Sequence, residues 1–302
     1  MAGKSIRHVG RVLARKGIRY VLWQGGRVLA RESLDRIERG YRRVLHRPVV
    51  AQVGQYRIEV PGDMMWAFRH GFYYEQDMTR WLPLLLQEAA SRVFYDVGAN
   101  YGYYSLLLAP VADSVHAFEP VSRTRAHLES ALARNQVGNV TVYPVALSDH
   151  VGSAEIRLYS SSGNNSLYDG DGGFFVRQIG TETVTLDTLD RQVYDLGMPP
   201  PGLIKMDVEG AELFVLRGAH RILREHHPIL TVEFSETLFE KAGYSRSDLV
   251  AELADAGYAI MAMPSSGPLR LLANGDDADN VVAVSTDALD RFQQFAGASQ
   301  ET

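Results

Sequence analysis

Apolar residues follow two different spacings along most of this chain, and the two spacings alternate. The run "VFYDV" at 93–97 has the β-branched and aromatic residues of a buried strand, and the apolar positions of 101–109 suit a helix. Similar strand-like runs recur at 114–119, 140–147, 153–160, 182–189, 202–208, 229–234, 259–263 and 280–285. Helical patterns recur at 121–135, 210–225 and 236–256. Strands that alternate with helices predict an α/β fold in which helices cover both faces of a mostly parallel sheet.

The beginning of the chain follows another pattern. Apolar residues at helical spacing predict one amphipathic helix around Ile6 and Leu13 and a second around Leu34 and Tyr41, with glycines at 25–26 between them. An isolated helix would expose such an apolar stripe, so we expect another surface to cover it.

Two further segments connect this beginning to the alternating pattern. Residues 49–60 alternate like a pair of strands, and 76–90 suit a helix despite Pro83. We therefore divide the chain into a basic helical arm with lead-in strands, 1–60, and a main domain, 61–302.

Composition and charge exclude several classes of function for this chain. Residues 1–47 carry 13 lysines and arginines against three acids, a net charge of +10, which leaves −15 for the rest of a chain whose total is −5. An acidic body without a nucleic-acid-binding motif argues against nucleic acid as a partner. The absence of cysteine excludes disulfides, thiolate catalysis and cysteine-bound zinc. With no apolar run of about 18 residues and no secretory signal, we expect a cytoplasmic protein.

The turn after the 93–97 strand is the first candidate site. Gly98 and Gly102 allow a sharp turn and a close approach of the backbone to a ligand, and Asp96 precedes them. In a parallel sheet the ligand lies beyond the carboxyl ends of the strands. A dinucleotide fold would show G-x-G-x-x-G here, whereas this chain has D-x-G-x-x-x-G. An acid at this position would repel a pyrophosphate but suits a ligand that carries an amino acid and a ribose.

The next strand ends in "AFEP", where Glu119 can accept hydrogen bonds from two vicinal ribose hydroxyls. Together, Asp96, Gly98, Gly102 and Glu119 resemble motifs I and II of class I S-adenosylmethionine-dependent methyltransferases. That resemblance implies a Rossmann-like, mostly parallel seven-stranded sheet, with the turn holding the methionyl and ribose part of the cofactor.

The resemblance extends over residues 70–235. The segments "FYDVGANYGYYSLLLA", "HAFEP", "VALSD", "VTLDTLD" and "IKMDVEGAELFVLRGA" occur in the order typical of the FkbM family of methyltransferases, which act on hydroxyls of sugars, glycolipids and polyketides. The cofactor-binding residues that the resemblance implies are Glu75, Asp96, Gly98, Asn100, Gly102, Glu119, Ser148 and Asp149.

The stretch "LIKMDVEGAE" is the second chemical centre. Lys205 and Asp207 point to the same face of a strand, and a buried lysine needs an acidic partner, which Asp207 or Glu209 can supply. We take these three residues as candidates for the chemistry with the acceptor, although the pairing can also be purely structural. His70 and His150 remain alternative bases.

Two acids end adjacent strands, Asp207 and Glu233. Carboxylates placed in this way can hold a hard divalent cation such as Mg²⁺, with water completing its coordination.

The favoured function is therefore transfer of a methyl group from S-adenosylmethionine to a hydroxyl on a sugar, oligosaccharide or glycolipid. The alternatives are a hydroxyl of a polyketide or other natural product, a nucleotide-dependent oxidoreductase, and a noncatalytic protein that binds the cofactor as a partner. For the arm we favour homodimerisation, because its +10 complements the −15 of a partner's body. Peripheral contact with an anionic membrane is the second choice.

The stretch 160–173, "SSSGNNSLYDGDGG", is a loop by composition. Such a long loop inside a compact domain is either functional or disordered.

Overall fold

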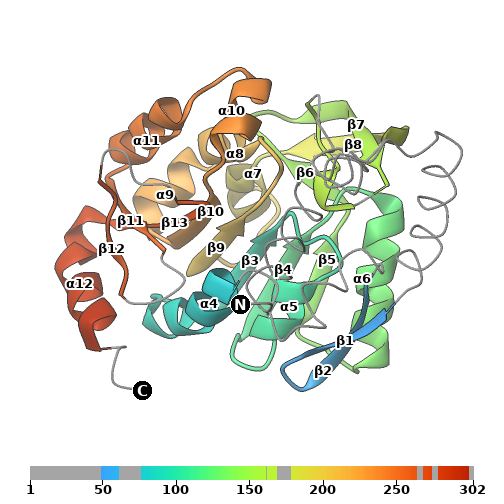
Figure 1. Cartoon of the computed structure of the whole chain (residues 1–302), viewed down its shortest axis with the longest axis horizontal. Helices are drawn as coiled ribbons and strands as arrows, with labels where there is room; N and C mark the ends of the chain where they lie inside the picture. Colours follow the sequence, from blue (N-terminus) through green and yellow to red (C-terminus); the bar gives the residue numbers. More distant parts are fainter. Residues whose placement is uncertain are drawn as a thin grey trace, which may run out of the picture.

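The computed structural model of the chain describes residues 49–60, 76–160, 162–168, 178–263, 268–273 and 278–298 (Figure 1). The predicted arm helices, Glu75 and His70 lie outside these residues.

The main sheet has eight strands, and its centre is parallel. In spatial order the strands are β12 (Arg270–Leu271), β11 (Tyr258–Ala262), β13 (Asn280–Ser285), β10 (Ile229–Glu233), β9 (Leu203–Met206), β3 (Val93–Val97), β4 (Ser114–Phe118) and β5 (Val140–Tyr143). Pairing is parallel from β10 to β5, whereas β13 runs antiparallel to β10. The mostly parallel sheet is thus confirmed. The expected strand number was too low by one, because two residues of β12 pair with the edge strand β11.

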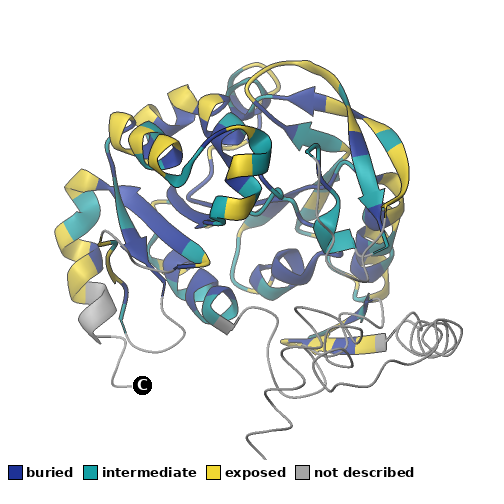
Figure 2. Ribbon diagram, turned by 45° about the horizontal axis from the view of Figure 1, so that its top comes forward, coloured by how far each residue is buried: buried dark blue, intermediate teal, exposed yellow. Residues whose placement is uncertain are grey.

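Helices cover both faces of this sheet (Figure 1). One face is covered by α4 (Gln76–Glu88), α5 (Tyr103–Leu108), α6 (Ser122–Arg134) and α12 (Leu289–Ala298). The other is covered by α7 (Leu189–Tyr194), α8 (Glu212–Arg217), α9 (His220–His226), α10 (Glu236–Ala242) and α11 (Arg246–Asp255). Side chains of a strand alternate between faces, so Phe94 packs in the first layer and Tyr95 in the second. Figure 2 shows the result, with buried strands between helices whose outer sides are exposed.

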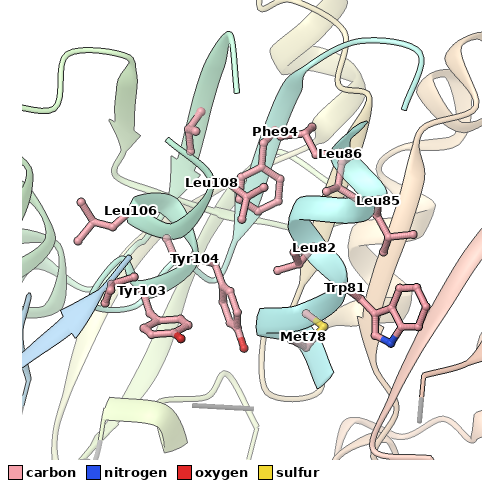
Figure 3. Packing of buried hydrophobic residues seen from close by; sticks show 14 of the residues in the cluster. Met78, Trp81, Leu82, Leu85, Leu86, Phe94, Tyr103, Tyr104, Leu106 and Leu108 are labelled. Atoms are coloured by element: carbon pink, nitrogen blue, oxygen red, sulfur yellow. The ribbon is translucent and has the colours of Figure 1, made fainter. Parts of the chain in front are cut away.

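The predicted helix over 76–90 forms as α4 and continues through Pro83. A proline inside a helix removes one backbone hydrogen bond. Burial of the apolar face compensates for this loss, since Trp81, Leu82 and Leu85 are fully buried (Figure 3). In Figure 3 Leu82 lies on the side of α4 that faces Tyr104 of α5, whereas Trp81 and Leu85 lie on the other side of the helix.

Pro144 divides the single strand expected over 140–147. The chain leaves the main sheet after β5, and β6 (Val145–Leu147) joins a second sheet of order β6-β8-β7, with β7 at Gly152–Tyr159 and β8 at Gln178–Asp187. Proline has no N–H to donate to a strand ladder, which explains the break.

The single helix expected over 210–225 is also divided, into α8 and α9. Gly218 lies at the break, and a β-carbon there would collide with the backbone carbonyl of Ser148. The break therefore lets the chain pass close to the segment that follows β6.

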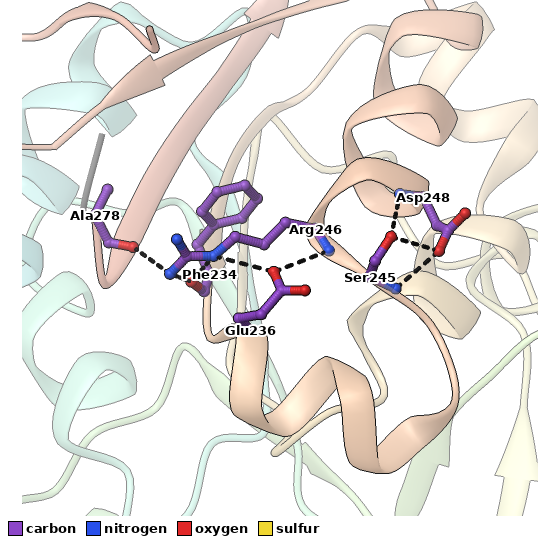
Figure 4. A network of polar contacts seen from close by, with 6 residues as sticks. All are labelled: Phe234, Glu236, Ser245, Arg246, Asp248 and Ala278. Carbon is purple, nitrogen blue, oxygen red and sulfur yellow. Dashed lines mark hydrogen bonds and ion pairs between the residues drawn. The ribbon is translucent and has the colours of Figure 1, made fainter. Parts of the chain in front are cut away.

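The carboxyl end of β10 is fixed by a polar network (Figure 4). The guanidinium of Arg246 donates to the Phe234 carbonyl from Nη2 at 2.6 Å and from Nε at 3.0 Å, and it lies 3.7 Å from Glu236. Ser245 and Asp248 form a capping box that begins α11.

The lead-in strands form a hairpin, β1 (Val49–Val53) with β2 (Tyr56–Val60), that packs into the same core as α4 and α5. Asn135, after α6, accepts from the Arg57 amide at 2.9 Å and donates to the Arg57 carbonyl at 2.7 Å. No helix in the described part of the chain has both the length and the apolar character needed to cross a membrane.

Candidate active site

A cavity lies at the carboxyl ends of β3, β4 and β9, the edge at which parallel sheets bind ligands. Five of the site residues predicted from sequence line this cavity: Gly98, Asn100, Glu119, Asp207 and Glu209. The sheet thus brings together residues that are more than 100 positions apart in the chain.

The turn after β3 is built on left-handed backbone. Gly98 has φ 75°, and a β-carbon there would collide with the backbone carbonyl of Asp207. Gly102 has φ 85°, and a β-carbon there would meet the side chain of Leu128 in α6 rather than backbone. Gly98 is therefore required by the close approach of two backbone segments and also lines the cavity, whereas Gly102 is favoured chiefly by its left-handed backbone.

Asn100 occupies the centre of this turn with φ 50°, a conformation that asparagine tolerates better than most residues. Its amide N–H donates to Glu119 Oε2 at 2.9 Å. Its side-chain oxygen Oδ1 is buried and has no hydrogen-bond partner among the described residues. Buried polar atoms are normally paired, so a ligand donor in the cavity would complete this site.

Glu119 closes the cavity at the end of β4. Its two oxygens accept backbone amide hydrogens from Asn100 and Val121, each at 2.9 Å. Burial raises the pKa of Glu119 to about 7, and these two hydrogen bonds oppose that shift. A carboxylate has about four acceptor positions, so two amides leave capacity for ligand hydroxyls.

Lys205 lies under the turn as a buried cation. Its Nζ donates to the Gly98 carbonyl at 3.0 Å and lies 3.5 Å from Asp96 and 3.4 Å from Asp207. Asp96 is fully buried and accepts from Ser105 Oγ at 2.6 Å. The pairing with Asp207 was predicted from the strand period, but the pairing with Asp96 and the contribution of Ser105 were not.

Three carboxylates gather above β9 and β10. One oxygen each from Asp207, Glu209 and Glu233 lies within 4.8 Å of the others. Glu209 joins this group because its backbone is left-handed, with φ 54°, in the turn before α8.

Glu212 is a fully buried acid next to this group. Its Oε1 accepts from the Val208 amide at 2.9 Å, and its Oε2 accepts from the Tyr244 hydroxyl at 3.2 Å. Burial raises the pKa of Glu212 to about 7, and the nearby charge of Asp207 acts in the same direction. The side chain therefore holds the turn that presents Asp207 and Glu209. Tyr244 could not be found from sequence because it lies 32 residues away.

The described part of the 160–173 loop crosses the cavity. Ser166 Oγ donates to the Glu209 carbonyl at 2.8 Å, and Ser166 pairs with Arg157 of β7 through its backbone. Ser162 and Leu167 line the cavity. This segment, 162–168, connects the second sheet to the turn after β9, and its composition alone indicated only a loop.

Ser148 and Asp149 are placed beside the cavity rather than in its lining. The preceding residues, 145–147, line it. Ser148 donates its amide to the Asp187 carbonyl at 2.8 Å. Partial burial opposes ionisation of Asp149, but the hydrogen bond from His150 at 2.6 Å outweighs it and lowers the pKa of Asp149.

Comparisons with known proteins agree with this arrangement. Residues 96–260 match the methyltransferase FkbM domain. The chain is 32% identical over 185 residues to the hexuronic acid methyltransferase AglP of Haloferax volcanii. This match covers 59% of this chain and 70% of AglP. It is 30% identical over 194 residues to the methyltransferase sdnD of Sordaria araneosa, and this match covers 55% of this chain and 73% of sdnD.

Among solved structures, the methyltransferase FkbM from Methylobacillus flagellatus KT has 19% sequence identity and a TM-score of 0.45, and the match covers 74% of this chain and 52% of that one. Because the domain match spans more than half of the 302 residues, the chain belongs to the FkbM family of methyltransferases and has the class I methyltransferase fold.

Proposed function

We propose that this methyltransferase transfers a methyl group from S-adenosylmethionine to a hydroxyl oxygen of a sugar unit. The observation that carries the proposal is the convergence of the Asn100 turn, Glu119 and the Asp207 group on one cavity. Glu119 has acceptor capacity for ribose hydroxyls, and Asn100 Oδ1 has no partner among the described residues. The hexuronic acid methyltransferase AglP supports a sugar as acceptor.

The cofactor supplies an activated methyl group bound to a sulfonium. In the transfer, the acceptor oxygen forms a bond to the methyl carbon, the carbon–sulfur bond breaks with its electron pair going to sulfur, and the hydroxyl proton leaves to a base. The protein must chiefly align the acceptor and accept this proton. Asp207 and Glu209 line the cavity and are our candidates for this role.

Lys205 has a different role in this proposal. Its ammonium is surrounded by Asp96, Asp207 and the Gly98 carbonyl, so we assign it to positioning of the turn and of Asp207. We therefore place the proton acceptor at Asp207 or Glu209 rather than at Lys205.

We further propose that the carboxylates of Asp207, Glu209 and Glu233 hold a divalent cation such as Mg²⁺. Their spacing supports this, since hard cations bind several carboxylate oxygens. Such a cation would orient the acceptor hydroxyl and lower its pKa.

Titration of the purified protein with S-adenosylhomocysteine and with NAD tests the cofactor. We expect binding of the former alone, and NAD binding would favour an oxidoreductase instead. A methyl-transfer screen with mass detection should then compare hexuronates, neutral sugars and glycolipids with polyketide hydroxyls. Binding without transfer to any acceptor class would favour a noncatalytic role.

A substitution and a chelation experiment distinguish general-base catalysis by a carboxylate from catalysis that needs a bound metal ion. Asp207→Asn should preserve cofactor affinity and lower turnover by at least about tenfold, because it removes charge but little volume. If a cation bridges the carboxylates, chelation should abolish activity and magnesium should restore it. Full activity after exhaustive chelation would leave general-base catalysis without metal.

A further inference from the structure

We propose that a second cavity, next to the first, binds an acidic sugar unit of the acceptor at a position remote from the transferred methyl group. The inference rests on the proposed function. The cavity has a volume of about 340 Å³ and is lined by residues from the end of β2, the first turns of α6 and the end of β7. This volume is at the lower end of the range for small-molecule sites, about 300–1,000 Å³.

The two cavities share a wall. Val121, Ser162 and Asn165 line both of them. Tyr101, which follows Asn100 of the first cavity, lines the second. An acceptor of more than one sugar can therefore contact both cavities, with its reacting unit in the first.

The charged side chains in its lining favour an acidic ligand in the second cavity. The lining includes the exposed Arg123, and this guanidinium forms no ion pair within the described residues. Glu59, also in the lining, is already neutralised by Arg134 at 2.7 Å. Arginine matches the planar geometry of a carboxylate with two parallel N–H groups. His127 adds a second nitrogen donor beside it.

The first amide of α6 and the side chain next to it already have an acidic partner. The Ser122 amide donates to Glu182 Oε1 at 3.0 Å, and the Ser122 hydroxyl donates to Glu182 Oε2 at 3.1 Å. The side chains of the lining that can donate to an anion include Arg123 and His127.

The other polar and aromatic side chains of the second cavity suit the parts of a sugar that lie beyond its carboxylate. The Tyr101 ring pairs with His127 at a centroid distance of 5.4 Å, and Tyr159 also lines the cavity. Thr124 is almost fully buried in the lining, and Ser162 Oγ is buried without a hydrogen-bond partner among the described residues. A sugar presents apolar C–H faces to rings and hydroxyls to such atoms, so a saccharide fits better than an inorganic anion.

The test uses the full chain saturated with S-adenosylhomocysteine. Binding of oligogalacturonates of two to four units is compared with binding of neutral maltotriose by calorimetry. We expect acidic oligomers to bind more tightly than maltotriose. Arg123→Gln should weaken their binding by at least about tenfold, since a charge-assisted pair is lost. Arg123→Lys should retain part of the affinity.

Arg92→Gln is the matched control, because Arg92 is also exposed but directly precedes the amino end of β3, whereas the cavities lie toward the carboxyl ends of the strands. Both variants should bind S-adenosylhomocysteine like the unmodified protein. Equal affinity of Arg123→Gln and Arg92→Gln for oligogalacturonate, or equal affinity of the protein for maltotriose, would overturn the second-site proposal alone. Failure of the unmodified protein to bind S-adenosylhomocysteine would instead overturn the proposed function.

Discussion

At the scale of single residues, the role proposed for Glu119 in cofactor binding implies that binding depends on pH. Burial raises its pKa to about 7, so near neutral pH the side chain exists in both protonation states. A protonated carboxyl loses acceptor positions and gains a donor, which suits ribose hydroxyls less well.

We therefore predict that affinity for S-adenosylhomocysteine falls as the pH decreases through about 7. Glu119→Gln should bind the ligand more weakly, by about 1.5–3 kcal/mol relative to the charged acceptor, and with little pH dependence. Calorimetric titrations between pH 6 and 8.5 measure both effects. Glu212→Gln is the control, because Glu212 has a similar raised pKa but contacts Val208 and Tyr244. A pH dependence that disappears in Glu212→Gln and persists in Glu119→Gln would contradict the assignment.

The same pKa shift acts on stability with the opposite sign. The folded protein holds the Glu119 proton more tightly than the unfolded chain does, since the pKa rises from 4.5 to about 7. The free energy of unfolding attributable to this group therefore decreases as the pH rises from about 4.5 to about 7.

Lys205 illustrates how a buried charge depends on its partners. Removal of one partner leaves the other buried and uncompensated, at a cost of about 3–5 kcal/mol. We predict that Lys205→Met lowers the free energy of unfolding by this amount, because Asp96 is fully buried beside it. The double variant Asp96→Asn with Lys205→Met should recover part of the loss, as denaturant unfolding can measure. If the two changes are simply additive, the two side chains do not interact as described.

At the scale of secondary structure elements, a short break between two helices allows two backbone segments to approach closely. Gly218 separates α8 from α9 at the point where the backbone meets Ser148. We predict that Gly218→Ala destabilises the protein by about 2 kcal/mol or more, because its β-carbon would collide with backbone that cannot move away cheaply.

Thermal unfolding measures this effect. Gly138→Ala is the control, since a β-carbon at Gly138 has no neighbour within 4 Å and its backbone is not left-handed. Equal melting temperatures of the two variants would show that the contact at Gly218 is relaxed in solution.

The elements also show what sequence can and cannot predict. The strand runs and the motif turn were recognisable because apolar spacing and Gly98 act locally. The breaks at Pro144 and Gly218 were missed because a proline or glycine within an apolar run does not reveal whether the run ends there or bends. In the site, Lys205 and Asp207 followed from the strand period, but Ser105, Tyr244 and Ser166 depend on tertiary contacts.

At the scale of the whole molecule, the basic arm remains a prediction, since 1–48 lie outside the described residues. Its +10 charge and the −15 of the remaining chain favour association between copies. We predict that deletion of residues 1–47 converts a dimer into a monomer, as measured by light scattering. An unchanged mass would refute the dimer role, and loss of binding to anionic vesicles would favour a membrane role.

The close approach of Gly98 to Asp207 couples the two turns that form the cavity. The Asp207 amide donates to the Val97 carbonyl at 3.2 Å, and Lys205 connects Gly98 to the Asp207 side chain. Neither the turn after β3 nor the turn after β9 can shift without displacing the other. Occupation of one side of the cavity should therefore change the affinity of the other side, and by thermodynamic linkage the effect must be equal in both directions. Cooperative binding of cofactor and acceptor would then arise from backbone packing between two strands, without a separate regulatory site.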